Sequence, residues 1–266
     1  MIPAKFDYIK AGSLSEAIAL LAKHGDDAKL LAGGHSLIPA MKLRLNRPGI
    51  LIDIGHLTEL KNISENGNEI VIGANCTHHQ IASSDLLARE ANVVSQAAKT
   101  IGDLQVRNRG TIGGSLAHAD PAADYPAALL AANAVIEVQG KNGKRKINAT
   151  DFFQGMYTTA LNEDEVITAI HIHRGSNGKY EKFFQPASRF AIVGVAVVKN
   201  GQEVRVGITG ASDTPYRATA VENAYAEKGP DAAELAAEGV EMLDDHFAGA
   251  AYRAHLAKVL TRKALA

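Results

Sequence analysis

Two short segments rich in glycine and hydroxyl side chains are the part of this sequence best suited to do chemistry. The first, LLAGGHSLIP, covers residues 30–39 and carries the pair Gly33-Gly34, and the second reads Thr-Ile-Gly-Gly-Ser over residues 111–115. Glycine permits φ > 0 and leaves no Cβ between the backbone and a ligand. Successive N–H groups in such a turn form a concave anion site. On the residues alone, a tight turn and a phosphate site explain each segment equally well.

Neither segment matches a familiar nucleotide-binding motif. No Gly-Lys-Ser/Thr sequence is present to make a P-loop, and the GxGxxG pattern of the Rossmann fold is absent as well. Two such segments that face one diphosphate from opposite sides would suit a dinucleotide lying between two subdomains.

The elements that must position these segments alternate between short strands and helices over the first 174 residues. Ser13 is a plausible N-cap, with Glu16 three residues later and Gly25 as a natural stop. Apolar runs predict short strands, and Asn142-Gly143 is a strong hairpin turn. The sequence predicts a helix at 13–25, strands at 28–33, 50–55, 69–75 and 164–174, mostly helix at 77–102, and a hairpin at 134–153.

The character of the sequence changes at GSNGKYEK, residues 175–182, which we interpret as a domain boundary. We expect one domain over residues 1–174, with subdomains at about 1–56 and 57–174, and a second over residues 175–266. The second domain should contain a hairpin around Asn200-Gly201 and then alanine-rich helices to the end. The fold class is therefore α+β.

Composition excludes several classes of function. A net charge of −1 gives no electrostatic footprint for nucleic acid. Cys76 is the only cysteine, so this chain alone holds no disulfide, iron–sulfur cluster or cysteine-rich zinc site. No secretory signal and no apolar run long enough for a transmembrane span are present. A cytoplasmic location follows, with peripheral attachment to the inner membrane through a complex left open.

Taken together, the stretches LLAGGHSLIPAMKLRL and RNRGTIGGSLAHADPAADYPAALLA resemble the FAD-binding medium subunit of the molybdenum hydroxylases. That family includes aerobic carbon monoxide dehydrogenase and xanthine dehydrogenase. The resemblance runs from FDYIKAGSLSEAIALLAKHG to AYRAHLAKVLTRKAL at the end of the chain. It implies a two-subdomain FAD-binding domain of the vanillyl-alcohol-oxidase (PCMH) type, followed by a C-terminal domain of antiparallel sheet and helices.

The resemblance also implies which residues hold the FAD diphosphate. Both segments would offer backbone N–H groups to it, which explains why few cationic side chains are needed. The residues carried over are Ala32, Gly33, Gly34, His35 and Ser36 with Leu37 beside them, and Thr111, Gly113, Gly114 and Ser115.

Further positions match cofactor contacts of the family, each with a plainer reading. Asp124 matches a carboxylate near the FAD and could equally be the N-cap of a helix. Ile101 and Ile167 match apolar contacts, and both would be ordinary core residues elsewhere. His78 lies in Cys-Thr-His-His, where relatives carry Thr-Thr-His near the flavin, and could simply be a surface or capping residue. Phe190 takes the place of a tyrosine near the isoalloxazine, which puts any hydrogen bond from that hydroxyl in doubt, and could be just part of a buried strand.

Two histidine-containing pairs are interpreted as structural. His118 and Asp120 lack a third metal ligand at a recognisable spacing, so a hydrogen bond that stabilises the loop is the simpler role. The pair His171 and His173 alternates along a strand and is expected to face solvent.

The resemblance implies an electron-transfer subunit with no catalytic residue of its own. In the family, a large molybdenum-cofactor subunit oxidises the substrate, and a small subunit passes electrons through two [2Fe–2S] clusters to this FAD. The flavin then reduces an external acceptor, which is a quinone, NAD or oxygen. A self-sufficient flavin oxidoreductase of the same fold and a non-enzymatic phosphate-binding module remain alternatives. The substrate belongs to another polypeptide, although a resemblance to carbon monoxide dehydrogenase is the expected one.

Overall fold

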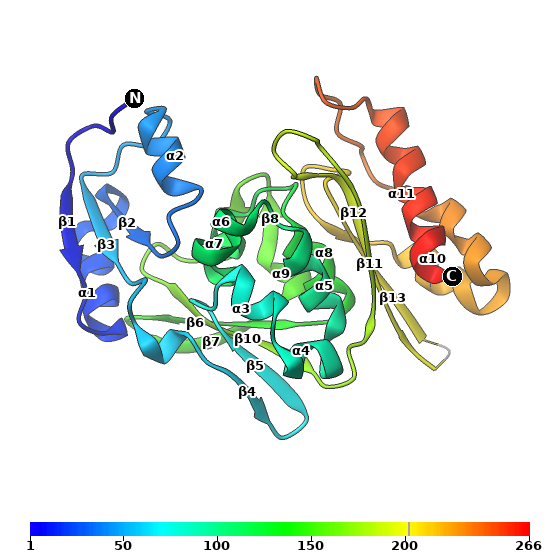
Figure 1. Ribbon diagram of the computed structural model, residues 1–266, viewed down its shortest axis with the longest axis horizontal. Coiled ribbons are helices and arrows are strands. Elements are labelled where there is room, and N and C mark those ends of the chain that lie inside the picture. The colour runs from blue at the N-terminus through cyan, green and yellow to red at the C-terminus, as the bar shows by residue number, and fades with distance from the viewer. Residues whose placement is uncertain (202) are drawn as a thin grey trace.

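The computed structural model describes residues 1–201 and 203–266, and Figure 1 shows three units in chain order, each built around its own sheet. The N-terminal sheet and the C-terminal helices lie on opposite sides of the central unit. This arrangement confirms the predicted α+β fold class, with antiparallel sheet and helices at the C-terminus. No helix among the described residues combines the length and the apolar character needed to cross a bilayer.

The N-terminal unit is a three-stranded parallel sheet with the strand order β1-β3-β2. The Ser13 hydroxyl accepts a hydrogen bond from the N–H of Glu16 at 3.2 Å, which confirms the predicted helix start. Because the strands are parallel, both connecting helices leave from the carboxyl edge of the sheet, and the first glycine segment is the connection that follows β2. The elements are β1 (Asp7–Lys10), α1 (Leu14–His24), β2 (Ala28–Leu31), α2 (Leu37–Lys42) and β3 (Ile50–Asp53), with 3-10 turns η1 (Gly25–Asp27) and η2 (Thr58–Leu60).

The central unit is a five-stranded antiparallel sheet, ordered β4-β5-β10-β6-β7, and helices pack on one of its faces. Every residue of α8 is buried, because this helix lies between the central helices and the C-terminal sheet. The elements are β4 (Ile63–Asn66), β5 (Glu69–Gly73), α3 (His78–Ala82), α4 (Asp85–Glu90), α5 (Asn92–Thr100), α6 (Leu104–Arg109), α7 (Ile112–His118), α8 (Asp124–Ala131), β6 (Val135–Gly140), β7 (Gly143–Asn148), α9 (Ala149–Phe152), β8 (Phe153–Gly155), β9 (Thr158–Thr159) and β10 (Val166–His173).

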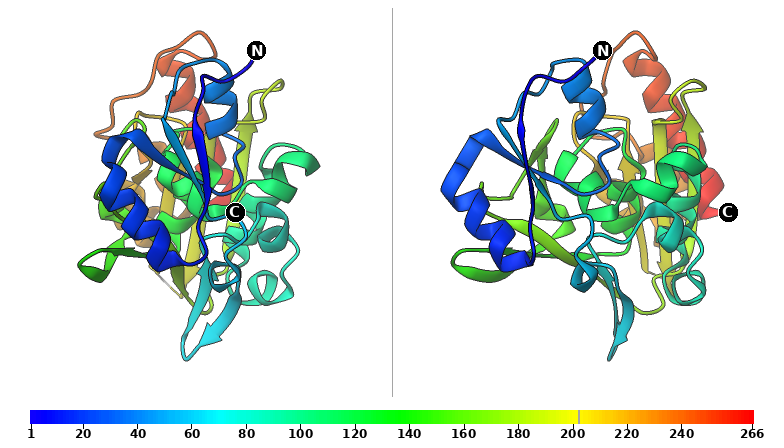
Figure 2. Two further views of the ribbon diagram at one scale, coloured as in Figure 1. Left: turned by 90° about the vertical axis from the view of Figure 1, so that its left-hand side faces the viewer. Right: turned by 60° about the vertical axis from the view of Figure 1, so that its left-hand side comes forward.

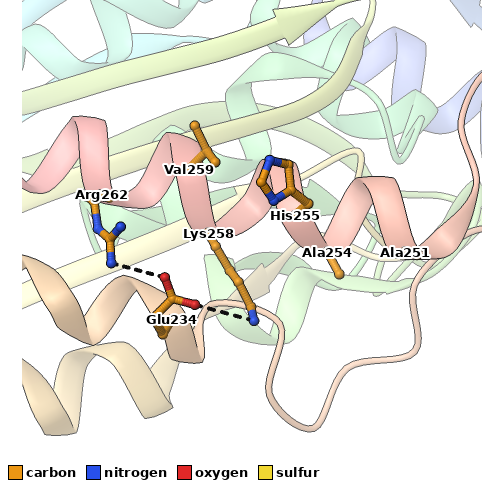
Figure 3. Close-up of a pocket in the computed structure, with 7 residues that line it drawn as sticks. All are labelled: Glu234, Ala251, Ala254, His255, Lys258, Val259 and Arg262. Atoms are coloured by element: carbon orange, nitrogen blue, oxygen red, sulfur yellow. Dashed lines mark hydrogen bonds and ion pairs between the residues drawn. The ribbon is translucent and has the colours of Figure 1, made fainter.

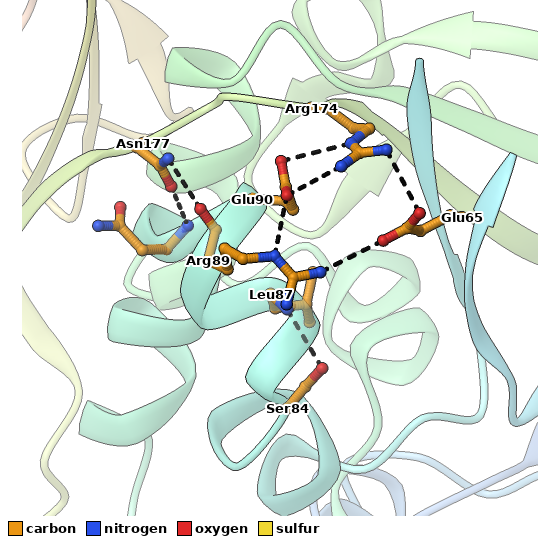
Figure 4. Close-up of polar contacts among 8 residues, drawn as sticks. Glu65, Ser84, Leu87, Arg89, Glu90, Arg174 and Asn177 are labelled. Carbon is orange, nitrogen blue, oxygen red and sulfur yellow. Dashed lines mark hydrogen bonds and ion pairs between the residues drawn. The ribbon is translucent and has the colours of Figure 1, made fainter. Parts of the chain in front are cut away.

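An exposed ion-pair network ties β4, α4 and the end of β10 together (Figure 4). Arg89 lies 3.4 Å from Glu65 and 3.0 Å from Glu90. Arg174 contacts the same two carboxylates at 3.3 and 2.9 Å. Exposed pairs of this kind each contribute little to stability, so the network acts chiefly by fixing where these elements meet.

The C-terminal unit is a four-stranded antiparallel sheet, ordered β11-β12-β13-β14, with α11 packed on β11 and β12. Helix α8 of the central unit packs on β12 and β13. Figure 1 shows this unit at the end of the molecule away from β1, and in the left view of Figure 2 it lies behind the N-terminal unit. The elements are β11 (Gly178–Phe184), β12 (Ala191–Asn200), β13 (Glu203–Thr209), β14 (Tyr216–Arg217), α10 (Thr219–Lys228), the 3-10 turn η3 (Gly229–Leu235) and α11 (Ala250–Leu265).

Both glycine segments contain helix that the sequence pattern did not predict. Pro39 is the third residue of α2. Proline is tolerated in the first turn, where its missing N–H has no partner in the helix. The second segment begins α7, because the Thr111 hydroxyl accepts the N–H of Gly114 at 3.1 Å and caps the helix.

The prediction of helix through to the C-terminus is wrong for residues 236–249, which form neither helix nor strand. Gly239 adopts φ 72, a left-handed conformation. The carboxylate of Asp245 accepts the N–H groups of Phe247 and Ala248 at 2.9 and 3.1 Å and pairs with the buried Arg253 of α11. These side-chain bonds satisfy the backbone in place of a helix.

Candidate functional site

The two glycine segments lie against each other in the folded chain. A Cβ added to Gly33 would overlap the backbone of Arg109 and Gly110, the two residues that precede the second segment. The N–H of His78 bonds the carbonyl of Gly110 at 2.9 Å, and Thr111 pairs with Thr77 as an isolated bridge. Gly33 is therefore glycine because two backbones meet there.

The first segment presents a run of hydrogen-bond donors. Among the described residues, no partner bonds the five consecutive backbone N–H groups from Gly33 to Leu37. Gly34 adopts φ 75, which turns the chain so that the donors follow one another around a bend. His35 and Ser36 are exposed, and Ala32 and Leu37 are half-buried. A diphosphate is a dianion that accepts several hydrogen bonds, so this donor set fits it.

The second segment offers a different set of groups. Gly114 is exposed and Ser115 half-buried, so an approaching ligand meets the Gly114 backbone and the Ser115 side chain. We expected this segment to offer backbone N–H groups to the diphosphate as the first one does. The structure shows instead that its N–H groups bond within the chain. They bond as Ile112 to Cys76 O at 3.1 Å, Gly113 to Ala74 O at 2.8 Å, Gly114 to Thr111 Oγ1 at 3.1 Å and Ser115 to Thr111 O at 3.0 Å.

His78 is buried beneath the second segment. It is the first residue of α3, and Thr77 caps this helix through a reciprocal pair of bonds with Gln80. The Nδ1 atom of His78 lies 3.1 Å from the hydroxyl of the buried Tyr125, and a Cβ on Gly110 would overlap its Nε2. Burial, helped by the nearby positive groups, lowers the pKa of His78 to about 4. The ring is therefore neutral at pH 7 and acts as a spacer under Gly110.

Asp124 is the first residue of α8, so the N-cap reading of this position is wrong. Its carboxylate is buried and lies 2.8 Å from the Lys182 ammonium, whose side chain is also only 4% exposed. It also accepts the hydroxyls of Tyr180 at 2.5 Å and Thr100 at 3.2 Å. Burial raises the pKa of Asp124, and these partners oppose the shift. The cluster joins α5 and α8 of the central unit to β11.

The remaining candidate residues are spread over several elements. Ile101 ends α5, and its carbonyl accepts a bond from Arg107 Nη1 at 2.9 Å. Ile167 is buried in the core of the central unit. Phe190 lies between β11 and β12 and is 44% exposed, so it is not part of a buried strand. These three positions remain predictions for cofactor contact.

The histidine pairs have clear structural roles. Asp120 accepts the N–H of Ala122 at 2.9 Å, as expected of a loop-stabilising group, and His118 packs on Tyr157 with 5.1 Å between ring centroids. His171 does not face solvent as expected. Its side chain is 8% exposed and lies 3.1 Å from Glu69, because neighbouring strands cover it. Among the described residues, no group of three metal-binding side chains gathers.

A groove of about 580 Å³ lies along α11, far along the chain from the glycine segments (Figure 3). Its cations are neutralised within the chain, since Glu234 pairs with Lys258 at 3.5 Å and with Arg262 at 3.0 Å. The two long cations that line this groove are thus engaged by a carboxylate of the chain itself.

Sequence reasoning missed Lys182 and Tyr180 as partners of Asp124, and Tyr125 as the partner of His78. A signal for the first two was present, because residues at i and i+2 of a strand point to the same face. In GKYEKFF this rule puts Tyr180 and Lys182 side by side on the face that turns toward α5 and α8. Nothing in the sequence indicates that Tyr125 reaches His78.

Comparison with known proteins gives consistent matches over the whole chain. The family model "FAD binding domain in molybdopterin dehydrogenase" matches residues 4–174, and "CO dehydrogenase flavoprotein C-terminal domain" matches residues 179–266. The carbon monoxide dehydrogenase medium chain of Hydrogenophaga pseudoflava is 39% identical, with 100% of this chain and 97% of that protein covered. The glyceraldehyde dehydrogenase medium chain of Sulfolobus acidocaldarius is 36% identical, with 99% and 98% covered.

Solved structures of similar proteins also match over the whole chain. A carbon monoxide dehydrogenase from Hydrogenophaga pseudoflava superposes with a TM-score of 0.95 at 40% identity, with 100% of this chain and 97% of that chain covered. Quinoline 2-oxidoreductase from Pseudomonas putida superposes with a TM-score of 0.93 at 29% identity, with 100% and 97% covered.

Gly33→Ala should separate the two segments and lower FAD occupancy of the purified protein by at least tenfold. Overpacking of this kind costs about 1–3 kcal/mol, and it falls on the contact between the segments. The flavin-to-protein absorbance ratio measures the effect. Gly155→Ala is the matched control, because its Cβ would meet Thr158 at an ordinary 3.6 Å. Full flavin retention by Gly33→Ala would show that the contact does not matter for binding.

Removing one member of the buried pair, as in Asp124→Asn or Lys182→Met, should destabilise the protein by about 3–5 kcal/mol, because the other charge loses its partner. The double variant Asp124→Asn/Lys182→Met should lose less than the sum of the two single variants. Urea unfolding measures these free energies. As a control, Lys263→Met removes the exposed ion pair between α11 and Glu181, a neighbour of Lys182 on β11. It should lower the free energy of unfolding by no more than about 1 kcal/mol. Additive single effects would contradict a coupled pair.

Folding stability should depend on pH through His78. Its pKa is about 4 in the folded state and about 6.5 when unfolded, so the unfolded chain binds more protons between these values. Stability is therefore fully present above about pH 6.5 and lost as pH falls toward 4, by about 3 kcal/mol at most. Thermal unfolding across this range measures the effect, and His78→Gln should flatten it. An unchanged slope in His78→Gln would assign the pH dependence to other groups.

Proposed function

This chain belongs to the family of FAD-binding medium subunits of the molybdenum hydroxylases, and from that premise we propose that it transfers electrons within a three-subunit complex. The electrons would arrive from [2Fe–2S] clusters on a small subunit and leave for an external acceptor such as a quinone, NAD or oxygen. Similar proteins include the medium chains of carbon monoxide dehydrogenase and glyceraldehyde dehydrogenase and the medium subunit of nicotine 6-hydroxylase. The molybdenum cofactor and the clusters belong to partner subunits.

One observation carries the proposal at the level of residues. The five N–H groups from Gly33 to Leu37 have no partner among the described residues, and the half-buried Ser115 side chain belongs to the segment packed against them. These groups would hold the FAD diphosphate, with Ala32 and Thr111 supporting them from behind. When bound, FAD supplies the redox chemistry of the chain.

The other candidate residues support this site in distinct ways. Neutral His78 holds Gly110 in place without adding charge beneath the diphosphate. The Asp124–Lys182 pair joins the central unit to β11 and so fixes the strand that leads to Phe190. Ile101 and the exposed Phe190 would supply apolar surface for the rest of the cofactor, and the buried Ile167 would support it from the core. The chain needs no acid, base or nucleophile for this task.

The decisive experiment purifies the tagged chain from cells that produce it with its natural partners. Two further subunits should co-purify, with flavin, iron and molybdenum in the same fraction. Substrate of the complex should then bleach the flavin absorbance of the assembly and leave that of the separated chain unchanged.

Two results would overturn the proposal. Purification without any molybdenum or iron–sulfur partner would contradict the subunit role. Rapid reduction of the isolated flavoprotein by a small substrate would instead identify a self-sufficient flavin oxidoreductase of the same fold.

A further inference from the structure

The end of α2 displays apolar side chains to solvent. Leu43 is 53% exposed and Leu45 is 80% exposed. Met1 and Ile2, at the start of the chain, are 87% and 80% exposed. Figure 1 and both views of Figure 2 place the N-terminus beside α2. We call Met1, Ile2 and residues 42–45 the α2 tip.

The α2 tip and the N-terminus are held together by the parallel sheet. Strand β1 pairs with β3 from Asp7 opposite Ile50, and the N–H of Asp7 bonds the carbonyl of Gly49 at 2.7 Å. The residues before β1 therefore run alongside the residues before β3. This register brings Met1 and Ile2 to the level of the turn that ends α2.

The turn that ends α2 contains residue types that do not favour its stability. The N–H of Leu45 bonds Ala40 O at 2.9 Å, and the N–H of Arg44 bonds Met41 O at 3.0 Å, which is the Schellman motif. Arg44 occupies its left-handed position with φ 62, where glycine is favoured. Leu45 occupies the position that commonly packs back on the helix, and it is exposed instead.

Cations surround these apolar side chains. Among the described residues, no carboxylate lies within ion-pair distance of Lys42, Arg44 or Arg47. Elsewhere most arginines are paired, as Arg89, Arg174 and other members of the exposed networks show. The α2 tip thus combines exposed apolar groups with unpaired positive charge.

We propose that the α2 tip is a docking surface for a partner subunit of the same complex, which offers an apolar depression edged by carboxylates. The inference rests on the proposed function, since that function supplies the partner. Exposed apolar groups at the centre of a contact with complementary charges at its rim are the usual composition of a protein interface. The leucines and the N-terminal residues would fill the depression, and the three cations would face the carboxylates.

The test uses the full complex, assembled from all of its subunits with the tag on this chain. Leu43→Ser/Leu45→Ser and Lys42→Glu/Arg44→Glu should each lower recovery of the partner subunits at least tenfold. Val259→Ser, which changes an apolar residue of α11 that is 46% exposed, should leave recovery unchanged. Arg44→Gly removes one cation and at the same time relieves the strain of the turn. A loss of partner binding in this variant would therefore reflect the lost charge and not a lower stability. Its melting temperature should be at least that of the wild type, and the amount of partner subunit that co-purifies with it should still be lower.

The outcomes separate this inference from the proposed function. If the wild-type chain recovers no partner subunit at all, the proposed function itself fails. If the wild type assembles and both double variants assemble equally well, the docking surface is wrong.

A membrane and a second copy of the chain are the competing occupants of the α2 tip. Flotation of the chain with phosphatidylglycerol vesicles that is lost in Leu43→Ser/Leu45→Ser, with normal assembly, would reassign the surface to lipid. Concentration-dependent dimerisation of the chain that is lost in the same variant, with normal assembly, would reassign it to self-association. Each result would overturn the proposal.

Discussion

The contact of Gly33 with the backbone of Arg109 and Gly110 is the constraint on which the site depends. It joins the N-terminal parallel sheet to the central unit at a point where neither Gly33 nor Gly110 has room for a side chain. Both segments approach this contact from the ends of regular elements, β2 and α6, so their relative position follows from the two sheets. A site assembled from two separate units therefore keeps a fixed geometry without a long connecting loop.

Charge is arranged so that the site relies on backbone dipoles. Beneath the second segment His78 is neutral at pH 7 because it is buried against Tyr125. The buried carboxylate of Asp124 is matched by Lys182 and two hydroxyls, so its charge is compensated before any ligand binds. Buried pairs of this kind contribute little net stability. The Asp124–Lys182 pair instead favours one packing of α8 against β11 over alternative packings.

Sequence reasoning predicts the regular parts of this protein and misses those that depend on contacts between distant segments. The N-cap at Ser13 and most strands follow from local rules, and the structure contains them. The hairpin predicted around Asn142-Gly143 is also present, but Gly140 pairs with Gly143, so its two-residue loop is Lys141-Asn142. Helix α2 was missed because Pro39 suggests a break when its position in the first turn is unknown. The burial of His171 depends on strands that flank it only after folding. Likewise, the pairing of residues 33–37 with residues 109–115 was suggested by their similar composition, while the reason for glycine at position 33 required the fold.

The near-zero net charge of the chain hides an uneven distribution that suits a dianionic cofactor. Glu65 and Glu90, two acidic side chains outside the glycine segments, are paired with Arg89 and Arg174. Within the described residues Arg107 and Arg109, which lie just before the second segment, have no carboxylate partner, and Arg107 binds the carbonyls of Ile101 and Gly102 instead. Their charge is therefore not cancelled locally. A protein that is almost neutral overall can in this way present a positive field where its free N–H groups gather, because charges interact strongly only within about 10 Å of one another at ordinary salt.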